Sequence, residues 1–189
     1  MKCYIALVHY PVYDKAGETI TSGITNLDLH DIARTATTYG IKDFYIIHPN
    51  EKQKQIFQKI LAFWKSEIAT FYNPHRVEAL TKVKMANSIE ETIKLIKNQE
   101  KDEPIIITTT AQKKSKQKCF LKTRKLLDCT EKPALILFGT ANGLHNDIHK
   151  NADIVLKPIQ ANANYNHLSV RSAVAIVLDR LFSEEYRRQ

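Results

Sequence analysis

Cysteine is scarce in this sequence, and long apolar runs are absent from it. The three cysteines, Cys3, Cys119 and Cys129, are odd in number and lack Cys-x-x-Cys spacing, which argues against a disulfide framework and a zinc site. No apolar run approaches the roughly 18 residues needed to cross a bilayer. The opening MKCYIALVHYP predicts a first strand rather than a signal peptide. We therefore expect a soluble cytoplasmic protein with no membrane partner.

The sequence also lacks the glycine patterns that hold phosphates. Neither the phosphate loop G-x-x-x-x-G-K-[ST] nor the nicotinamide-binding turn G-x-G-x-x-G occurs in it. Only five glycines are present, and two of them, Gly139 and Gly143, fall within five residues of each other in LILFGTANGL. So close a pair indicates either a tight turn or a place where another group approaches the backbone.

Positive charge exceeds negative charge along the chain. There are 28 Lys and Arg against 20 Asp and Glu, which gives a net charge of +8 and favours a polyanionic partner. The excess is concentrated in residues 112–125, QKKSKQKCFLKTRK, where seven side chains are basic and none is acidic. Such a cluster is either a solvated surface loop or a binding surface, and both interpretations stay open here.

Short β-rich runs alternate with amphipathic helices. Strands are predicted at 3–12, 44–49, 105–110, 134–140 and 154–159, with a weaker one at 77–85. Helices are predicted at 27–40, 53–64 and 88–99, the first ending at Gly40 and the last opening on Ser88 and Glu91 as a capping box. The alternation predicts an α/β fold, in which residues 1–189 form a single domain with a mostly parallel sheet and helices on both faces.

Three of these predicted strands end in small and polar residues. The strand 105–110 closes in TTT before Ala111, the strand 134–140 closes in the glycine turn GTANG, and the strand 154–159 runs into PIQANANYNHLS. The carboxyl ends of parallel strands meet at one edge of a sheet, where such folds bind their ligands. A pocket there would offer backbone groups, hydroxyls and amides, which suits an uncharged base with its ribose.

The order and spacing of three motifs resemble the SpoU-like branch of the SPOUT RNA methyltransferases. The first is DLHDIARTATTYGI, with Arg34 at the family's arginine position; the second is LILFGTANGL; the third is IVLKPIQANANYNHLSVRSAVAIVL. Together they cover nearly the whole chain. The resemblance implies a SPOUT-like parallel-sheet fold whose C-terminal segment forms a trefoil knot, an exception to the rule that chains do not thread loops.

The resemblance also implies S-adenosylmethionine as cofactor, RNA (tRNA or rRNA) as substrate, and a homodimer. The dimer would form through the C-terminal helix, where residues 173–178, AVAIVL, are apolar all round and need cover on more than one side. Burial inside one subunit is the alternative. The residues that would line the adenosyl pocket are Thr109, Gly139, Thr140, Gly143, Ile159 and Leu168.

Four residues are candidates for catalytic roles beside the methyl group. The resemblance places Arg34, Asn166 and Ser169 there, although Arg34 could instead pair with Asp31, and Asn166 and Ser169 could cap the last helix. Asp28 stands where the family has asparagine. It could serve as base for a guanine ring nitrogen, or it could cap its own helix, so the acceptor stays open between ribose 2′-oxygen and guanine nitrogen.

The second motif also departs from the family, because TAN replaces Asn-Glu-Gly and removes an acid. That loss favours an alternative hypothesis, a non-catalytic RNA-binding protein that keeps the fold. In either case the basic stretch follows the 105–110 strand to the pocket rim and is expected to hold RNA phosphates. The residues proposed for this contact are Lys113, Lys114, Lys116, Lys118 and Arg124, together with Lys122 and Lys125.

Histidine offers no predicted metal site. His145 and His149 lie four residues apart, but the glutamate of an H-E-x-x-H motif is missing, and methyl transfer needs no metal. We expect both to be surface residues.

Overall fold

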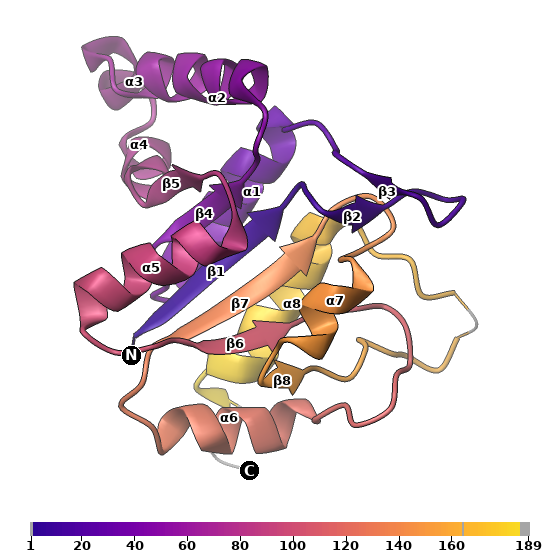
Figure 1. The fold of residues 1–189 in the computed structure, drawn as a ribbon. Coiled ribbons are helices and arrows are strands. Elements are labelled where there is room, and N and C mark those ends of the chain that lie inside the picture. The colour runs from indigo at the N-terminus through magenta and orange to yellow at the C-terminus, as the bar shows by residue number, and fades with distance from the viewer. Residues whose placement is uncertain (1, 164, 186–189) are drawn as a thin grey trace.

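A six-stranded sheet forms the centre of the computed structural model, which describes residues 2–163 and 165–185 (Figure 1). Its strands are β1 (Cys3–Val8), β4 (Phe44–Ile47), β5 (Val83–Ala86), β6 (Ile105–Thr108), β7 (Ala134–Gly139) and β8 (Ile154–Val155). They lie in the order β5-β4-β1-β7-β6-β8, and every neighbouring pair is parallel. A separate antiparallel hairpin joins β2 (Val12–Tyr13) to β3 (Thr19–Ile20). The predicted parallel sheet is confirmed.

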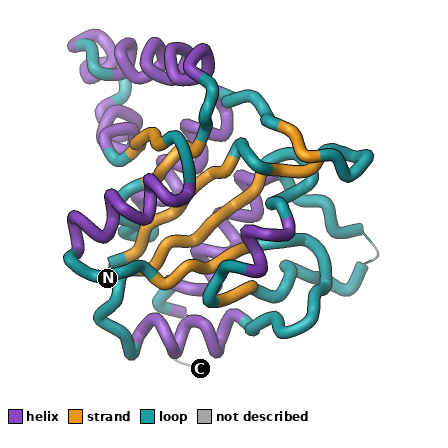
Figure 2. Tube along the Cα trace, viewed as in Figure 1, coloured by secondary structure: helices purple, strands orange, loops and turns teal. Residues whose placement is uncertain are grey.

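Helices cover both faces of this sheet, as Figure 2 shows. They are α1 (Asn26–Thr38), α2 (Glu51–Trp64), α3 (Glu67–Tyr72), α4 (Pro74–Thr81), α5 (Ile89–Glu100), α6 (Phe120–Asp128), α7 (Asn146–Lys150) and α8 (Val170–Phe182). Alternate residues of β1 belong to two separate hydrophobic clusters, because successive side chains of a strand point to opposite faces. Ile5 packs with residues of α1 and α8, whereas Tyr4 packs in the cluster that contains Ile96 of α5.

Three predicted strands end or begin elsewhere in the structure. The first strand stops at Val8, and Val12 belongs to the separate hairpin. The last strand covers only Ile154–Val155, after which Leu156 forms an isolated bridge with Lys118. The strand predicted at 77–85 is mostly wrong, because β5 begins only at Val83. Residues up to Thr81 belong to α4, which Asn73 caps by accepting from Arg76 N–H and which has Pro74 in its first turn.

The predicted helix ends are largely confirmed. Gly40 follows α1 with φ +67°, a left-handed conformation that glycine adopts without steric cost. Ser88 caps α5 by accepting a hydrogen bond from Glu91 N–H at 3.2 Å, as one half of a capping box does. The Glu91 carboxylate accepts instead from Asn87 N–H.

Two C-terminal segments lie beside the loop that follows β6. Lys118 and Leu156 pair as a parallel bridge, and Asn166 Nδ2 donates to Ala111 O at 2.9 Å. The trefoil knot itself stays a prediction. On α8, five apolar side chains are buried within the chain: Val174, Val177, Leu178, Leu181 and Phe182. Burial inside one subunit therefore covers one side of this helix, and the homodimer stays a prediction.

Within residues 2–163 and 165–185, no helix is both long enough and apolar enough to cross a membrane.

Candidate active site

A cavity of about 640 Å³ opens at the carboxyl edge of the sheet. Three of its wall segments follow β6, β7 and β8, and a fourth is the 22–28 stretch that leads into α1. This volume lies within the range of sites that enclose a small molecule or cofactor. The position agrees with the rule that open α/β sheets bind ligands beyond the carboxyl ends of their strands.

The glycine pair shapes the wall after β7. A Cβ added at Gly139 would lie 2.6 Å from Leu144 N and 2.9 Å from Gly143 C, so the loop itself occupies the space that a side chain would need. Gly143 has φ +106°, and its N–H donates to Thr140 O at 2.9 Å. The close approach indicated by the sequence is therefore made by the chain folding back on its own strand.

A second wall segment begins at Ser22 and ends at Asp28. Thr25 caps α1, accepting from Asp28 N–H at 3.1 Å, while its hydroxyl donates to Asp28 Oδ2 at 2.6 Å. Arg171 Nε, at the start of α8, lies 3.7 Å from Asp28 Oδ1 and 3.7 Å from Asp31 Oδ2. The alternative that Asp28 caps its helix is therefore wrong, because Thr25 is the cap of α1. Asp28 lines the cavity, and its role as a base stays a prediction.

Asn166 and Ser169 both line the cavity from the segment before α8. Ser169 caps α8, because its Oγ accepts from Ser172 N–H at 3.3 Å, as the alternative interpretation held. Asn166 has a different role, since its Nδ2 donates to Ala111 O and ties two walls of the cavity together.

All six residues predicted for cofactor binding line this one cavity. Two of them are anchored by their side chains: Thr109 Oγ1 donates to Leu137 O at 3.0 Å, and Thr140 Oγ1 donates to Val8 O at 3.1 Å. Their roles toward a ligand stay predictions. The six are Thr109, Gly139, Thr140, Gly143, Ile159 and Leu168.

Arg34 does not reach the cavity of its own chain. It is exposed on α1, beside Thr38 and close to Ala175 of α8. It lies six positions after Asp28, and at about 100° per residue the two side chains are about 120° apart around the helix. The suggested pairing with Asp31 is absent from the ion pairs of the described residues, where Asp31 pairs with Arg171.

The basic stretch splits into two parts with different surroundings. Lys113 and Lys116 are exposed on the loop after β6, whereas Lys114 Nζ donates to Asn146 Oδ1 at 2.6 Å. Lys118 N–H donates to Val155 O in the bridge that carries the loop past β8. These four lysines belong to the loop of which Gln112 lines the cavity.

The prediction that Arg124 contacts RNA is wrong. Arg124 is only 3% exposed, and its Nη2 donates to Ser183 O, at the end of α8, at 2.6 Å. The helix α6 packs the face that carries Arg124 and Leu127 against α8, and only the opposite face leaves Lys122 and Lys125 exposed. Basic residues that are neighbours in sequence point to different sides once the segment forms a helix, so only some of them remain exposed.

The prediction that His149 lies on the surface is wrong. It is buried, its Nδ1 lies 2.9 Å from Thr108 Oγ1, and desolvation by burial lowers its pKa to about 4. His145 is partly exposed and caps α7, accepting from Asp147 N–H at 3.3 Å. Across residues 2–163 and 165–185, no three side chains of His, Cys, Asp or Glu gather as metal ligands do.

Two features of the site were missed in the sequence. Arg171 bridges Asp28 and Asp31, and two acids three residues apart on one helix are a signal that could have indicated a cation partner. The 22–25 segment, by contrast, gave no signal, since its place beside Thr140 depends on contacts between residues far apart in sequence.

The fold and the cavity together define an α/β protein with a cavity beyond the carboxyl ends of its strands, where such folds bind ligands. A family model described as SAM-dependent RNA methyltransferase matches residues 2–183. The chain belongs to this family of S-adenosylmethionine-dependent RNA methyltransferases.

Relatives and solved structures agree with that assignment. An uncharacterized protein of Aquifex aeolicus is 38% identical over 180 residues, which cover 95% of this chain and 88% of that protein. A protein of Oleidesulfovibrio alaskensis named tRNA (guanine-N(1)-)-methyltransferase is 39% identical over 181 residues, covering 96% of this chain and 42% of that protein. The chain thus spans less than half of that relative.

Among solved structures, the A. aeolicus TrmH/SpoU tRNA modifying enzyme superposes with a TM-score of 0.62. The sequence identity is 14%, over 99% of this chain and 77% of that one, so the comparison concerns the fold alone. The expected family of RNA methyltransferases is confirmed, and the fold is similar to that of the SpoU-like solved structure. Family membership favours an enzyme over the alternative of a binding module.

Proposed function

We propose that this protein transfers a methyl group from S-adenosylmethionine to tRNA, with a guanine ring nitrogen as the acceptor and Asp28 as the base. The observation that carries the proposal is the convergence of Asp28, Asn166 and Ser169 on the cavity whose other wall is the glycine loop. The guanine-specific name of the O. alaskensis relative supports it, although that name describes a protein more than twice as long as the matched part.

The residues of the cavity fit S-adenosylmethionine. Ile159 and Leu168 offer apolar surface for an adenine ring, and the loop from Gly139 to Gly143 offers backbone groups in place of side chains. When bound, the cofactor supplies a methyl group already activated by its sulfonium. The protein has then to hold the acceptor in line and remove its proton.

Asp28 is the residue that this chain offers for proton removal. A guanine ring N–H is far more acidic than a ribose hydroxyl, so a carboxylate is an adequate base for it. Thr25 donates to one carboxylate oxygen and Arg171 lies beside the other, which together fix the direction in which Asp28 faces. Lys113 and Lys116, exposed on the loop after β6, would hold phosphates of the RNA at the rim.

A homodimer through α8 is also part of the proposal. Ala175 and Ile176 stay partly exposed, and Ala175 borders the surface hollow that contains Arg34. A second subunit placed there would cover the apolar residues that the first leaves open. Sedimentation equilibrium distinguishes a dimer from a monomer directly.

The test is to incubate the protein with unmodified tRNA and methyl-labelled S-adenosylmethionine, then digest the RNA and separate its nucleosides. Label in a methylguanosine whose methyl lies on the base supports the proposal. Label in 2′-O-methyl nucleosides would give the same enzyme a ribose acceptor and would remove the proposed role of Asp28. In a parallel incubation with unmodified ribosomal RNA, label in that RNA but not in tRNA would contradict tRNA as the substrate.

A further inference from the structure

Two buried histidines stand side by side at the carboxyl ends of neighbouring strands. His9 directly follows β1 and His48 directly follows β4, where Val8 and Ile47 pair in register. His9 is 0% exposed and His48 is 1% exposed, and their ring centroids lie 5.5 Å apart. Neither ring lines the cavity, so neither is a candidate for touching the cofactor or the RNA.

Both histidines hold Ser22, which does line the cavity. His9 Nδ1 lies 2.9 Å from Ser22 Oγ, and Ser22 N–H donates to His9 O at 3.0 Å. His48 Nε2 lies 3.0 Å from Ser22 O. The amide, the carbonyl and the hydroxyl of Ser22 are therefore all engaged by these two residues.

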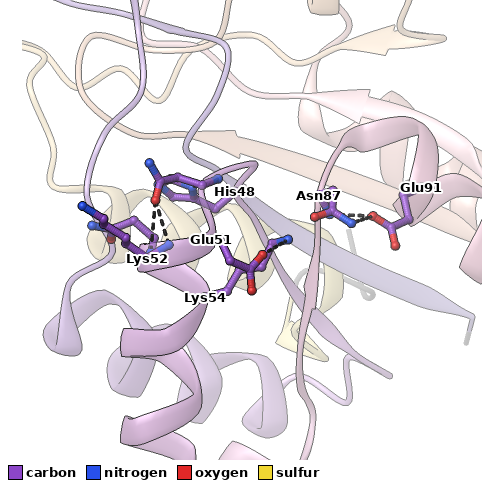
Figure 3. Close-up of polar contacts among 8 residues, drawn as sticks. His48, Glu51, Lys52, Lys54, Asn87 and Glu91 are labelled. Atoms are coloured by element: carbon purple, nitrogen blue, oxygen red, sulfur yellow. Dashed lines mark hydrogen bonds and ion pairs between the residues drawn. The ribbon is translucent and has the colours of Figure 1, made fainter.

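The contacts of His48 fix its protonation state. Asn50 N–H donates to His48 Nδ1 at 3.0 Å, and because a backbone N–H can only donate, Nδ1 carries no proton. The proton of the neutral ring is therefore on Nε2, which donates to Ser22 O. Figure 3 shows His48 before the start of α2, near the ion pair of Glu51 with Lys54.

The contacts of His9 can be assigned in the same way. Thr140 Oγ1 donates to Val8 O, since a carbonyl only accepts, so the Ser22 hydroxyl donates to Thr140 Oγ1. His9 Nδ1 must then donate to Ser22 Oγ, which leaves Nε2 as the unprotonated nitrogen. That Nε2 is buried and has no hydrogen-bond partner among the described residues.

The side chain of Gln53 also holds this segment through a hydrogen bond. Ile24 N–H donates at 2.9 Å to the side-chain oxygen of Gln53, in the first turn of α2, whose cap is the same Asn50 that contacts His48. Residues 22–24 are thus tied to two strand ends and one helix. The wall that they begin continues through Thr25 to Asp28.

We propose that His9 and His48 are positioning residues for methyl transfer, which hold the 22–28 wall against the bound cofactor only while both imidazoles are neutral. A proton on His48 Nδ1 would face the Asn50 N–H, and a proton on His9 Nε2 would be buried without an acceptor. The inference rests on the proposed function, because the cavity concerned is the cofactor cavity.

We therefore expect low pH to protonate these histidines and to release the 22–28 wall from them. Desolvation by burial, with a smaller contribution from His48, lowers the pKa of His9 from 6.5 to about 4, and burial also lowers the pKa of His48. Both values lie below those of the unfolded chain, so the contribution of the histidines is complete above about pH 6.5 and is lost as pH falls toward 4. The charged group that faces the pair is Lys54 of α2, which pairs with Glu51 at 2.9 Å.

The test compares substitutions that remove the donor with substitutions that keep it. Calorimetric titration with S-adenosylmethionine at pH 7.5 is expected to show binding weakened about tenfold or more in His48→Leu and His9→Leu, the scale of one buried hydrogen bond. His48→Gln and His9→Asn keep an N–H at the required place and should stay within about threefold of the wild type. The matched control is His149→Leu, a buried histidine with one hydroxyl partner outside the 22–28 wall.

The pH profile separates positioning from a purely structural role. Wild-type affinity should fall between pH 6.5 and 4.5, and the double variant His9→Asn/His48→Gln should show a flatter profile because amides do not titrate there. Equal pH dependence in both proteins would overturn the proposal, as would unchanged affinity in both leucine variants. If a leucine variant fails to fold, the amide variants and their profiles still decide.

Failure of the proposed function would look different. If the wild type binds no S-adenosylmethionine, nitrogen chemical shifts of the histidines still report the arrangement, with a proton expected on His48 Nε2 and on His9 Nδ1 at pH 6. A doubly protonated ring at that pH would contradict the positioning role independently of any ligand.

Discussion

The two long walls of the cavity are held in different ways. At Gly139 the wall from Gly139 to Gly143 is shaped by backbone, since Leu144 N lies within 2.6 Å of where a Cβ at position 139 would stand. The wall from Ser22 to Asp28 is held by side chains of His9, His48, Gln53 and Arg171. The first should therefore tolerate no added atom, whereas the second should respond to lost hydrogen bonds and to protonation.

The largest expected effect comes from adding one carbon to the backbone wall. In Gly139→Ala the Cβ would overlap Leu144 N, so the loop must move, and affinity for S-adenosylmethionine should fall about 100-fold, or roughly 3 kcal/mol. The matched control is Gly23→Ala on the other wall, where the nearest atom is Gln53 Oε1 at 4.0 Å and affinity should stay within about twofold. Equal losses in the two variants, measured by calorimetry, would remove the distinction between the walls.

The next effect concerns chemistry at the side-chain wall. Asp28→Asn keeps the size of the side chain but removes the base, so kcat should fall by about 10² to 10⁴ while cofactor affinity stays within about threefold. Asp31→Asn is the control, because Asp31 also contacts Arg171 but does not line the cavity. Single-turnover rates with labelled cofactor measure both. Similar losses of rate in the two variants would argue that Arg171 pairing, rather than a base, explains the effect.

A moderate effect is expected at the rim. Replacing Lys113 and Lys116 by Gln should weaken RNA binding and lower the slope of log K against log salt by about 1.4 for single-stranded RNA. Lys122 and Lys125, on the exposed face of α6, provide a double variant of equal charge change, which should alter the slope less. Filter binding between low and physiological salt gives both slopes. A larger change in the α6 variant would place the RNA on that helix instead.

The smallest effect is expected at Arg34. Since this side chain is exposed on α1 and does not line the cavity of its own chain, Arg34→Ala should leave the affinity for S-adenosylmethionine within about twofold. The same calorimetric titration measures it. A tenfold loss would show that α1 faces the cofactor differently from the arrangement described here, or that a second subunit brings Arg34 to the site.

Much of the fold could be predicted because its signals are local. Apolar runs such as IIIT and LILF mark strands buried on both faces, and both Ser88 and Gly40 act at the helix ends where the sequence placed them. Residues 77–81 were misassigned because a strand-like run of apolar residues lies behind an Asn-Pro start that begins a helix. The helix-start signal was present and should have prevailed.

The site was predictable where a residue follows its strand directly. Thr109, Gly139 and Thr140 reach the cavity simply because β6 and β7 end there. Arg124 and His149 could not be placed, since their burial depends on Ser183 and Thr108, 59 and 41 residues away along the chain. The same holds for the contact of Ser22 with Thr140, which joins residues 118 positions apart.

A calorimetric titration of the wild-type protein with S-adenosylmethionine, with ATP and NAD as controls, tests most directly whether this cavity binds the methyl donor. We expect saturable binding of one molecule per chain, competition by S-adenosylhomocysteine, and no heat from either control. Absence of saturable binding, or equal binding of ATP, would contradict the assignment of this cavity as the methyl-donor site.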